Sequence, residues 1–324
     1  MSSSAPSLSA PLPAQSTPAD PRRGWLLFCL FALYFIWGST YLAIRWALEG
    51  GFPPLRLGGL RFTLAGAILY GVLRLRGMRS PTRREWMAGA FTGFLLLVVG
   101  NGCVAYAQQW VSSGVAALVV GSMPLWAALF GGLYEGQWPG RAERWGLALG
   151  FFGIALLNQG GELGGRWLPV VALLFAPLAW AFGSIWARHH AFMPQGLMAT
   201  ATQMLCSGAA LLVLSAATGE HMLGMPDARG LASFFYLVAF GSLIAFSAYG
   251  YLLRHARPAL ATSYAYVNPM VAVLLGVLLG GETPGPHAFV AMTAILAAVV
   301  LITRRAPAKV RREASAQAST PSTS

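Results

Sequence analysis

Apolar runs of about 20 residues recur along the chain from Trp25 almost to Thr303, separated by short polar loops. A transmembrane helix needs about 20 mostly apolar residues to cross a bilayer. Proline and glycine at the joints divide the pattern into ten predicted helices. They cover residues 25–46, 54–74, 86–107, 111–133, 144–160, 167–187, 194–217, 230–252, 259–280 and 284–303. The pattern predicts an all-α integral membrane protein.

Composition points to the same class. Hydrophobic residues make up 56% of the 324-residue chain and charged residues only 10%. Because a soluble domain carries about 25% charged residues, most of this chain cannot face water. The three cysteines lie inside apolar runs without CxxC spacing, so no metal, disulfide or redox role is expected.

The formal net charge of +12 comes from basic residues that gather in alternate loops. This distribution follows the positive-inside rule and places both termini in the cytoplasm, which requires an even number of spans. Nucleic acid is not an expected partner. Residues 1–24 and 304–324 are polar and are predicted to be disordered cytoplasmic tails. Arginine supplies nearly all of the 22 basic residues, which indicates a GC-rich bacterial genome and hence a bacterial inner membrane.

The sequence repeats itself. A shift of 145 residues aligns Gly38-Ser39 with Gly183-Ser184 and Pro124 with Pro269. Each half, 25–160 and 167–303, would hold five helices, so the second half would enter the membrane from the opposite side. Inverted repeats are common in secondary transporters, where the substrate site lies near the membrane midplane between the repeats.

Several motifs extend this interpretation. Trp37-Gly38-Ser39-Thr40 and Tyr266-Val267-Asn268-Pro269, together with Leu60-Arg61-Phe62, resemble the EamA family of the drug/metabolite transporter superfamily. The stretches 98–102 and 179–184 extend the resemblance to the YedA-like permeases. The resemblance covers about residues 25–303. It implies ten helices in two EamA repeats and export of amino acids or related metabolites. One departure is that Glu135 lies two residues out of register with Glu282.

Polar and aromatic residues inside the predicted spans are the candidates for substrate binding. Buried Trp and Tyr need polar partners, which a solute cavity supplies. The candidates are Trp37, Tyr41, Asn101, Tyr106, Trp180, Tyr249, Tyr264, Tyr266 and Asn268. Arg61 is the clearest intramembrane charge, and it could bind a substrate carboxylate or serve a structural pairing.

A second group of residues concerns packing and movement. Pro124 and Pro269 occupy matching places, where each would form either a hinge or a simple kink. Gly38, Ser39, Gly183 and Ser184 are small residues that would allow close helix contact.

The predicted function is secondary transport of a small molecule across the bilayer. The sequence has no Walker loop, HExxH or GxSxG motif, so we expect neither an enzyme nor a cofactor. Proton antiport and uniport are equally compatible with the sequence, since no acid lies clearly in mid-helix. The alternatives are transport of drug-like molecules or nucleotide sugars, and a lipid-handling membrane protein.

Overall fold

The structure is a computed structural model that describes residues 21–136, 141–159, 166–190, 192–194, 196–255 and 264–303. These residues form helices and connecting loops, with no strand among them. The predicted tails lie outside the described residues, except that the first helix begins at Pro21.

The described helices follow a similar order in both halves of the chain. In the first half they are α1 (Pro21–Glu49), α2 (Pro54–Leu75), α3 (Arg83–Gly93), η1 (Phe94–Asn101), α4 (Gly102–Ala107), α5 (Ser113–Val120), α6 (Met123–Glu135) and α7 (Arg141–Gln159). In the second half they are α8 (Trp167–His189), α9 (Leu197–Ala217), α10 (Ala228–Tyr236), η2 (Leu237–Ile244), α11 (Ala245–His255), α13 (Tyr264–Leu278) and α14 (Pro286–Thr303). The order differs in that α5 and α6 of the first half correspond to the single described helix α13 in the second.

Six helices in the described part of the chain are long and apolar enough to cross a membrane: Gly24–Glu49, Arg83–Ala107, Ser113–Tyr134, Trp167–His189, Leu197–Ala217 and Ala228–Leu252. Two shorter apolar helices are Val267–Leu278 and Pro286–Ala298. The chain is therefore an all-helical membrane protein.

The predicted helix 111–133 is present as the apolar span Ser113–Tyr134, but a turn at Gly121-Ser122 interrupts it between α5 and α6. Pro124 explains the break. It has no N–H to donate to the preceding turn, and it occupies the first turn of α6, where that N–H is not needed. Pro269, its counterpart in the repeat, lies inside the continuous helix α13.

Two π-helical segments, which the sequence pattern does not predict, occupy corresponding places in the two halves. η1 joins α3 to α4, and η2 joins α10 to α11. A π-turn widens the helix and often marks a functional site. Here η1 ends at Asn101, and η2 contains Gly241 and Ser242, all of which matter for the cavity described below.

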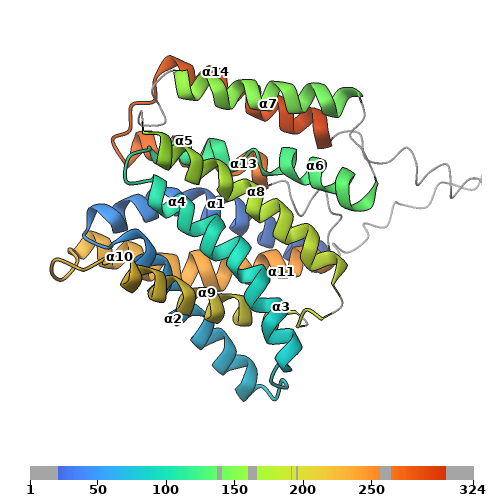
Figure 1. The fold of residues 1–324 in the computed structure, drawn as a ribbon, viewed down its shortest axis with the longest axis vertical. Coiled ribbons are helices and arrows are strands. Elements are labelled where there is room, and N and C mark those ends of the chain that lie inside the picture. Colours follow the sequence, from blue (N-terminus) through green and yellow to red (C-terminus); the bar gives the residue numbers. More distant parts are fainter. Residues whose placement is uncertain are drawn as a thin grey trace, which may run out of the picture.

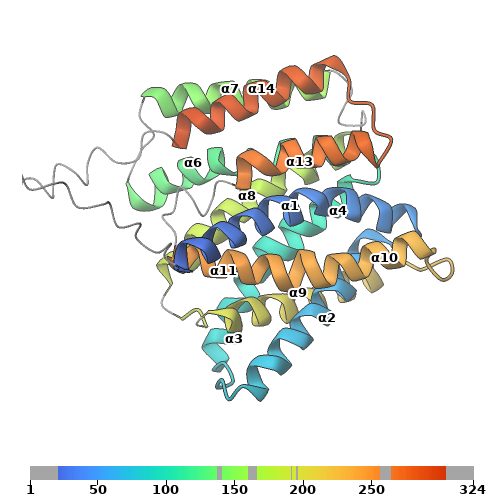
Figure 2. The same cartoon turned by 180° about the vertical axis from the view of Figure 1, so that it is seen from behind.

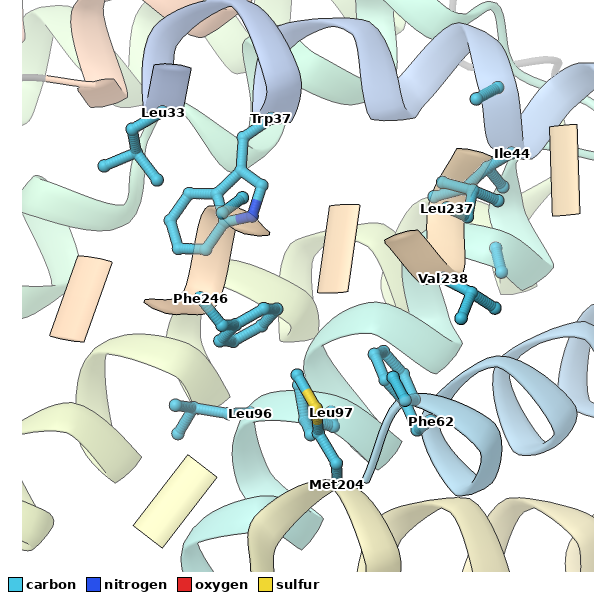
Figure 3. Close-up of a cluster of buried hydrophobic side chains, with 14 of the residues drawn as sticks. Leu33, Trp37, Ile44, Phe62, Leu96, Leu97, Met204, Leu237, Val238 and Phe246 are labelled. Atoms are coloured by element: carbon cyan, nitrogen blue, oxygen red, sulfur yellow. The ribbon is translucent and has the colours of Figure 1, made fainter. Parts of the chain in front are cut away.

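Equivalent helices of the two halves pack on each other: α2 on α9, and α7 on α14. The pair α7–α14 forms one outer layer, α6 and α13 come next, and α2 lies at the opposite end (Figures 1 and 2). Helix α1 begins, and α14 ends, on the same side of the bundle in both views. Below α1, the buried side chains of Phe62, Leu97 and Met204 form part of the largest apolar cluster (Figure 3).

Candidate functional site

A cavity of about 80 Å³ lies between the two halves of the chain. Helices α1, α2, α5 and α6 contribute to its wall from the first half, together with η1 and α4. Helices α8, α11 and α13 contribute from the second. The side chains on the wall are mostly apolar or aromatic, with a few polar groups among them, as is usual for a small-molecule site.

One face of α1 forms a large part of this wall. Trp37, Thr40, Tyr41 and Ile44 all line the cavity. Their spacing of three, four and seven residues places them on the same side of a helix with 3.6 residues per turn. Helix α13 packs closely against another side of α1, since a Cβ added at Gly38 would lie 2.6 Å from Val271 Cβ.

Trp37 is the centre of an aromatic cluster. Its ring centroid lies 5.0 Å from that of Tyr264, 5.2 Å from those of Phe246 and Tyr249, and 6.1 Å from that of Trp180. The indole Nε1 donates a hydrogen bond of 3.3 Å to the Gly241 carbonyl in η2. Figure 3 shows Trp37 on α1 projecting toward Phe246. The cluster thus ties α1 to three helices of the second half.

Arg61 brings a positive charge to the wall. Its side chain is buried, and the residue is only 4% exposed. Nε donates a 2.8 Å hydrogen bond to Ser242 Oγ in η2, and the guanidinium carbon lies 4.9 Å from the centre of the Phe62 ring. No other buried arginine lines the cavity among the described residues.

Two asparagines, Asn101 and Asn268, add polar groups to the cavity wall. Asn101 Nδ2 donates to the Leu96 carbonyl in η1 over 3.4 Å. With its amide nitrogen turned toward two carbonyls, Asn268 donates to Tyr264 O (3.2 Å) and Tyr34 O (3.1 Å). Both asparagines are thereby held in fixed positions on the cavity wall.

Two further polar atoms come from aromatic side chains on the wall. The indole Nε1 of Trp180 and the hydroxyl of Tyr264 are buried, and the Tyr264 hydroxyl lies near the polar atoms of Trp180 and Tyr249 without full hydrogen-bond geometry. Polar groups bonded this weakly to one another can also bond to a ligand in the cavity.

The structure brings seven of the ten predicted substrate-binding residues to the cavity wall: Trp37, Tyr41, Arg61, Asn101, Trp180, Tyr264 and Asn268. Tyr249 lies one layer behind, in ring contact with Trp37 and Tyr264. Tyr106 lines a different pocket, near the loop that joins α1 and α2, and stacks edge-on against Trp110. The side chain of Tyr266 is outside the described residues.

Of the predicted hinge and packing residues, Pro269 lines the cavity, whereas Pro124 does not. A Cβ added at Gly183 would lie 3.0 Å from Leu95 Cβ in η1, so this glycine permits close contact as Gly38 does. The hydroxyls bond elsewhere: Ser184 donates to Trp180 O, and Ser39 contacts both Ile36 O and the Tyr236 hydroxyl.

Sequence reasoning missed the wall residues Thr40, Ile44 and Phe246, and it missed Ser242, which lies behind the wall and supports Arg61. Thr40 and Ile44 follow from the helical spacing that starts at Trp37. Phe246 and Ser242 carry no sequence signal, because an aromatic or a serine in an apolar run has no distinguishing pattern. Among the described residues no group of three His, Cys, Asp or Glu could hold a metal.

A second polar centre lies at the ends of α1, α5 and α13. Glu282 Oε1 accepts hydrogen bonds from Ser113 N (2.8 Å) and from Arg45 Nη1 (2.6 Å), and Oε2 accepts one from Gly114 N (3.2 Å). Burial acts to raise the pKa of Glu282, but hydrogen bonds from Ser113, Arg45 and Gly114 outweigh it and lower the pKa below its ordinary value. Glu282 thus joins the second half of the chain to the N-terminus of a helix in the first.

Comparison with known proteins identifies several that are similar to this chain. The chain is 46% identical over 279 residues to the uncharacterized inner membrane transporter YedA of Escherichia coli K12, covering 86% of this chain and 90% of the relative. It is 27% identical to a probable terminal-alkyne amino-acid exporter of Streptantibioticus cattleyicolor, with 86% of this chain and 93% of that protein covered. A solved crystal structure shares the fold, with a TM-score of 0.63 and 21% identity over 86% of this chain and 97% of the other.

The model of the EamA-like transporter family matches residues 24–159 and 167–304, which include nearly all of the described helices and every residue on the cavity wall. The family match agrees with the motifs around Trp37 and Asn268. This membrane protein therefore belongs to the EamA-like transporter family.

Proposed function

We propose that the protein exports amino acids or related small metabolites, using the central cavity as its substrate site. The observation that carries the proposal is the composition of the wall, which combines an aromatic cluster, two fixed asparagines and one buried arginine. An amino acid presents a carboxylate, an ammonium group and a side chain; the arginine can bind the carboxylate, and the faces of the aromatic rings can bind the ammonium group. The relative named as an amino-acid exporter supports the same substrate class.

The size of the cavity supports a small solute over the larger alternatives. Its volume of about 80 Å³ is below the roughly 300–1,000 Å³ of sites for drug-sized ligands. A nucleotide sugar would also require several basic groups, and Arg61 is the one arginine on the wall among the described residues. Transport of a nucleotide sugar or drug-like molecule is therefore the less favoured use of this site.

The mechanism we propose is alternating access between two inverted repeats of five membrane spans each, 25–160 and 167–303. Packing of α2 on α9 and of α7 on α14 supports a two-fold relation between the halves. In such a transporter one repeat rocks against the other around a central site. Contacts such as Trp37 with Phe246, which join the halves, would have to change during this motion.

We further propose ten spans in the inner membrane with both termini cytoplasmic. The start of α1 and the end of α14 on one side of the bundle support an even number of crossings (Figure 1). Arginines gather where α2 joins α3, such as Arg74 in the last turn of α2 and Arg79 in the loop, and this supports a cytoplasmic location for that side.

Efflux from proteoliposomes tests the function. The purified chain is reconstituted, the vesicles are loaded with each labelled amino acid in turn, and efflux is followed with and without a pH gradient. We expect saturable efflux that Trp37→Ala and Asn268→Ala reduce about ten-fold or more. Acceleration by the gradient would demonstrate proton coupling, and no response would indicate uniport.

Tyr106→Ala is the matched control, because it also removes an aromatic side chain but lies in a different pocket. It should leave efflux within about two-fold of the wild type. Equal losses in all three variants would place the substrate elsewhere. No efflux of any amino acid from correctly folded protein would reject the substrate class.

A further inference from the structure

Arg61 is a buried cation whose positive charge no protein carboxylate balances in the described part of the chain. The residue is 4% exposed, and its one hydrogen bond of normal geometry runs from Nε to the neutral hydroxyl of Ser242. No carboxylate oxygen among the described residues lies within the 4.0 Å of an ion pair. Such a charge is expensive in a low-dielectric interior unless another group compensates for it.

The carboxylates of the protein itself are held elsewhere. The structure describes five such side chains, and each lies at or near a helix end: Glu49, Glu85, Glu220, Asp227 and Glu282. Glu49 pairs with Arg45 and Arg229, and Glu85 pairs with Arg79.

The other three carboxylates accept backbone N–H groups at the starts of helices. Glu220 accepts hydrogen bonds from backbone N–H groups at the start of α2. Asp227 accepts one from the N–H group of Gly230 in α10, and Glu282 accepts those from the N–H groups at the start of α5. None of the five carboxylates is therefore available to Arg61.

The π-helix η2 fixes the guanidinium while leaving part of it open to the cavity. The Ser242 hydroxyl accepts the hydrogen bond from Nε, and a Cβ added at Gly241 would lie 3.0 Å from Nη2, so Gly241 lets the guanidinium pack closely against η2. The ring of Phe62 packs against the same group. The Nη1 and Nη2 edge has two N–H groups side by side, which is the geometry that binds both oxygens of a carboxylate.

We infer that Arg61 binds the carboxylate group of the transported solute, and that Ser242 positions Arg61 for this contact. The inference rests on the proposed transport function and narrows its substrate class to solutes with a carboxylate. The remainder of the solute would extend toward the aromatic cluster, where Trp180 Nε1 and the Tyr264 hydroxyl line the cavity and are only weakly bonded to each other. The charge of Arg61 then serves selection of the solute and does not serve the stability of the fold.

Matched ligands test the inference directly. The unfolding temperature of the full chain in detergent is measured with the L-amino acids, with their primary amides, and with short-chain monocarboxylates that lack an amino group. We expect stabilisation by at least one carboxylate, and at least ten-fold weaker binding of its amide. Arg61→Gln should abolish this preference, while Arg61→Lys, which keeps the charge, should retain part of it.

Two further variants separate a binding role from a structural one. Arg61→Met keeps the apolar stem and removes the unpaired charge, so the ligand-free protein should unfold at the same or a higher temperature. Ser242→Ala should weaken carboxylate binding several-fold and keep the preference over the amide. Arg56→Gln, the same kind of change on the same helix but off the cavity wall, is the control and should bind as the wild type does.

Each result decides between the proposals. Efflux of amino acids without discrimination against the amides, or with discrimination that survives in Arg61→Gln, would overturn the inference and leave the proposed function standing. Monocarboxylates that bind through Arg61 without any amino-acid efflux would support the inference and reject the proposed function. If none of the carboxylates changes the unfolding temperature, or if Arg61→Met unfolds at a clearly lower temperature, the inference is wrong.

Discussion

Replacement of Glu282 by alanine should destabilise the protein more than any other loss of a single described carboxylate. The Glu282 side chain is 5% exposed and links three elements. It accepts the N–H groups of Ser113 and Gly114 at the start of α5, and it pairs with Arg45 of α1. Glu282→Ala removes all three interactions at once and leaves two backbone donors of α5 without an acceptor.

The expected loss in the free energy of unfolding follows from these contacts. A hydrogen bond to a charged group contributes about 1.5–3 kcal/mol, so the two N–H groups together account for roughly 3–6 kcal/mol. Arg45 adds little, because its side chain is 28% exposed and water replaces the lost partner. Water that enters the space left by the carboxylate recovers part of the loss. We therefore expect unfolding to be easier by about 3–4 kcal/mol.

Acidity should act on the same group. The pKa of Glu282 in the folded protein lies below the ordinary value of 4.5, because the hydrogen bonds from Ser113, Arg45 and Gly114 outweigh its burial. A carboxyl group with a lowered folded pKa contributes stability above its unfolded pKa and loses it as the pH falls through the folded value. The wild type should thus lose stability below about pH 4.5, and Glu282→Ala should lose less over the same range.

Denaturant unfolding in detergent, followed by tryptophan fluorescence at pH 7 and at several pH values down to 3, measures both effects. Glu49→Ala is the matched control: its carboxylate also pairs with Arg45, but it is 38% exposed and should contribute only about 0–1 kcal/mol. If Glu282→Ala costs no more than Glu49→Ala, or if both variants follow the acid profile of the wild type, the reasoning on Glu282 is refuted.

Three other predictions concern helix contacts. Gly208→Ala should destabilise the α2–α9 pair by about 1–3 kcal/mol, because a Cβ there would lie 2.5 Å from Thr63 N; thermal unfolding measures this. Glu220→Ala should cost about 1 kcal/mol in the same assay, since its carboxylate accepts the first N–H groups of α2. Trp37→Phe should keep the fold but reduce efflux, because the indole N–H bonds to Gly241 O.

A control variant and a contradicting result can be stated for these predictions. Gly71→Ala adds a methyl group to α2, the helix that Gly208 of α9 contacts, but no atom lies within 4 Å of the added Cβ, so the stability of this variant should match or exceed that of the wild type. If Gly208→Ala behaves like Gly71→Ala, the α2–α9 contact is looser than described. An unchanged rate in Trp37→Phe would assign the role of Trp37 to its ring alone, and an unchanged unfolding temperature in Glu220→Ala would show that water caps α2 equally well.

The sequence alone predicted the class of the protein and the approximate position of its helices. Hydrophobicity is a local property, so runs of apolar residues and the glycines and prolines between them mark helices without reference to the rest of the fold. The same locality explains which details the pattern does not predict. Nothing in the stretch 111–133 marks the turn that divides this span into α5 and α6, and the π-segments η1 and η2 leave no trace in the composition.

Only the tertiary structure decided which side chains meet. A membrane helix can be apolar on every side, so its sequence does not reveal which side faces a cavity. Tyr106 and Trp37 are both aromatic residues inside predicted membrane spans, yet they line different pockets. The isolation of Arg61 from every described carboxylate, and its contact with Ser242, which is 181 positions away, depend on how the two halves pack. Packing between residues far apart in the sequence therefore determines which side chains form the site, and the local pattern does not.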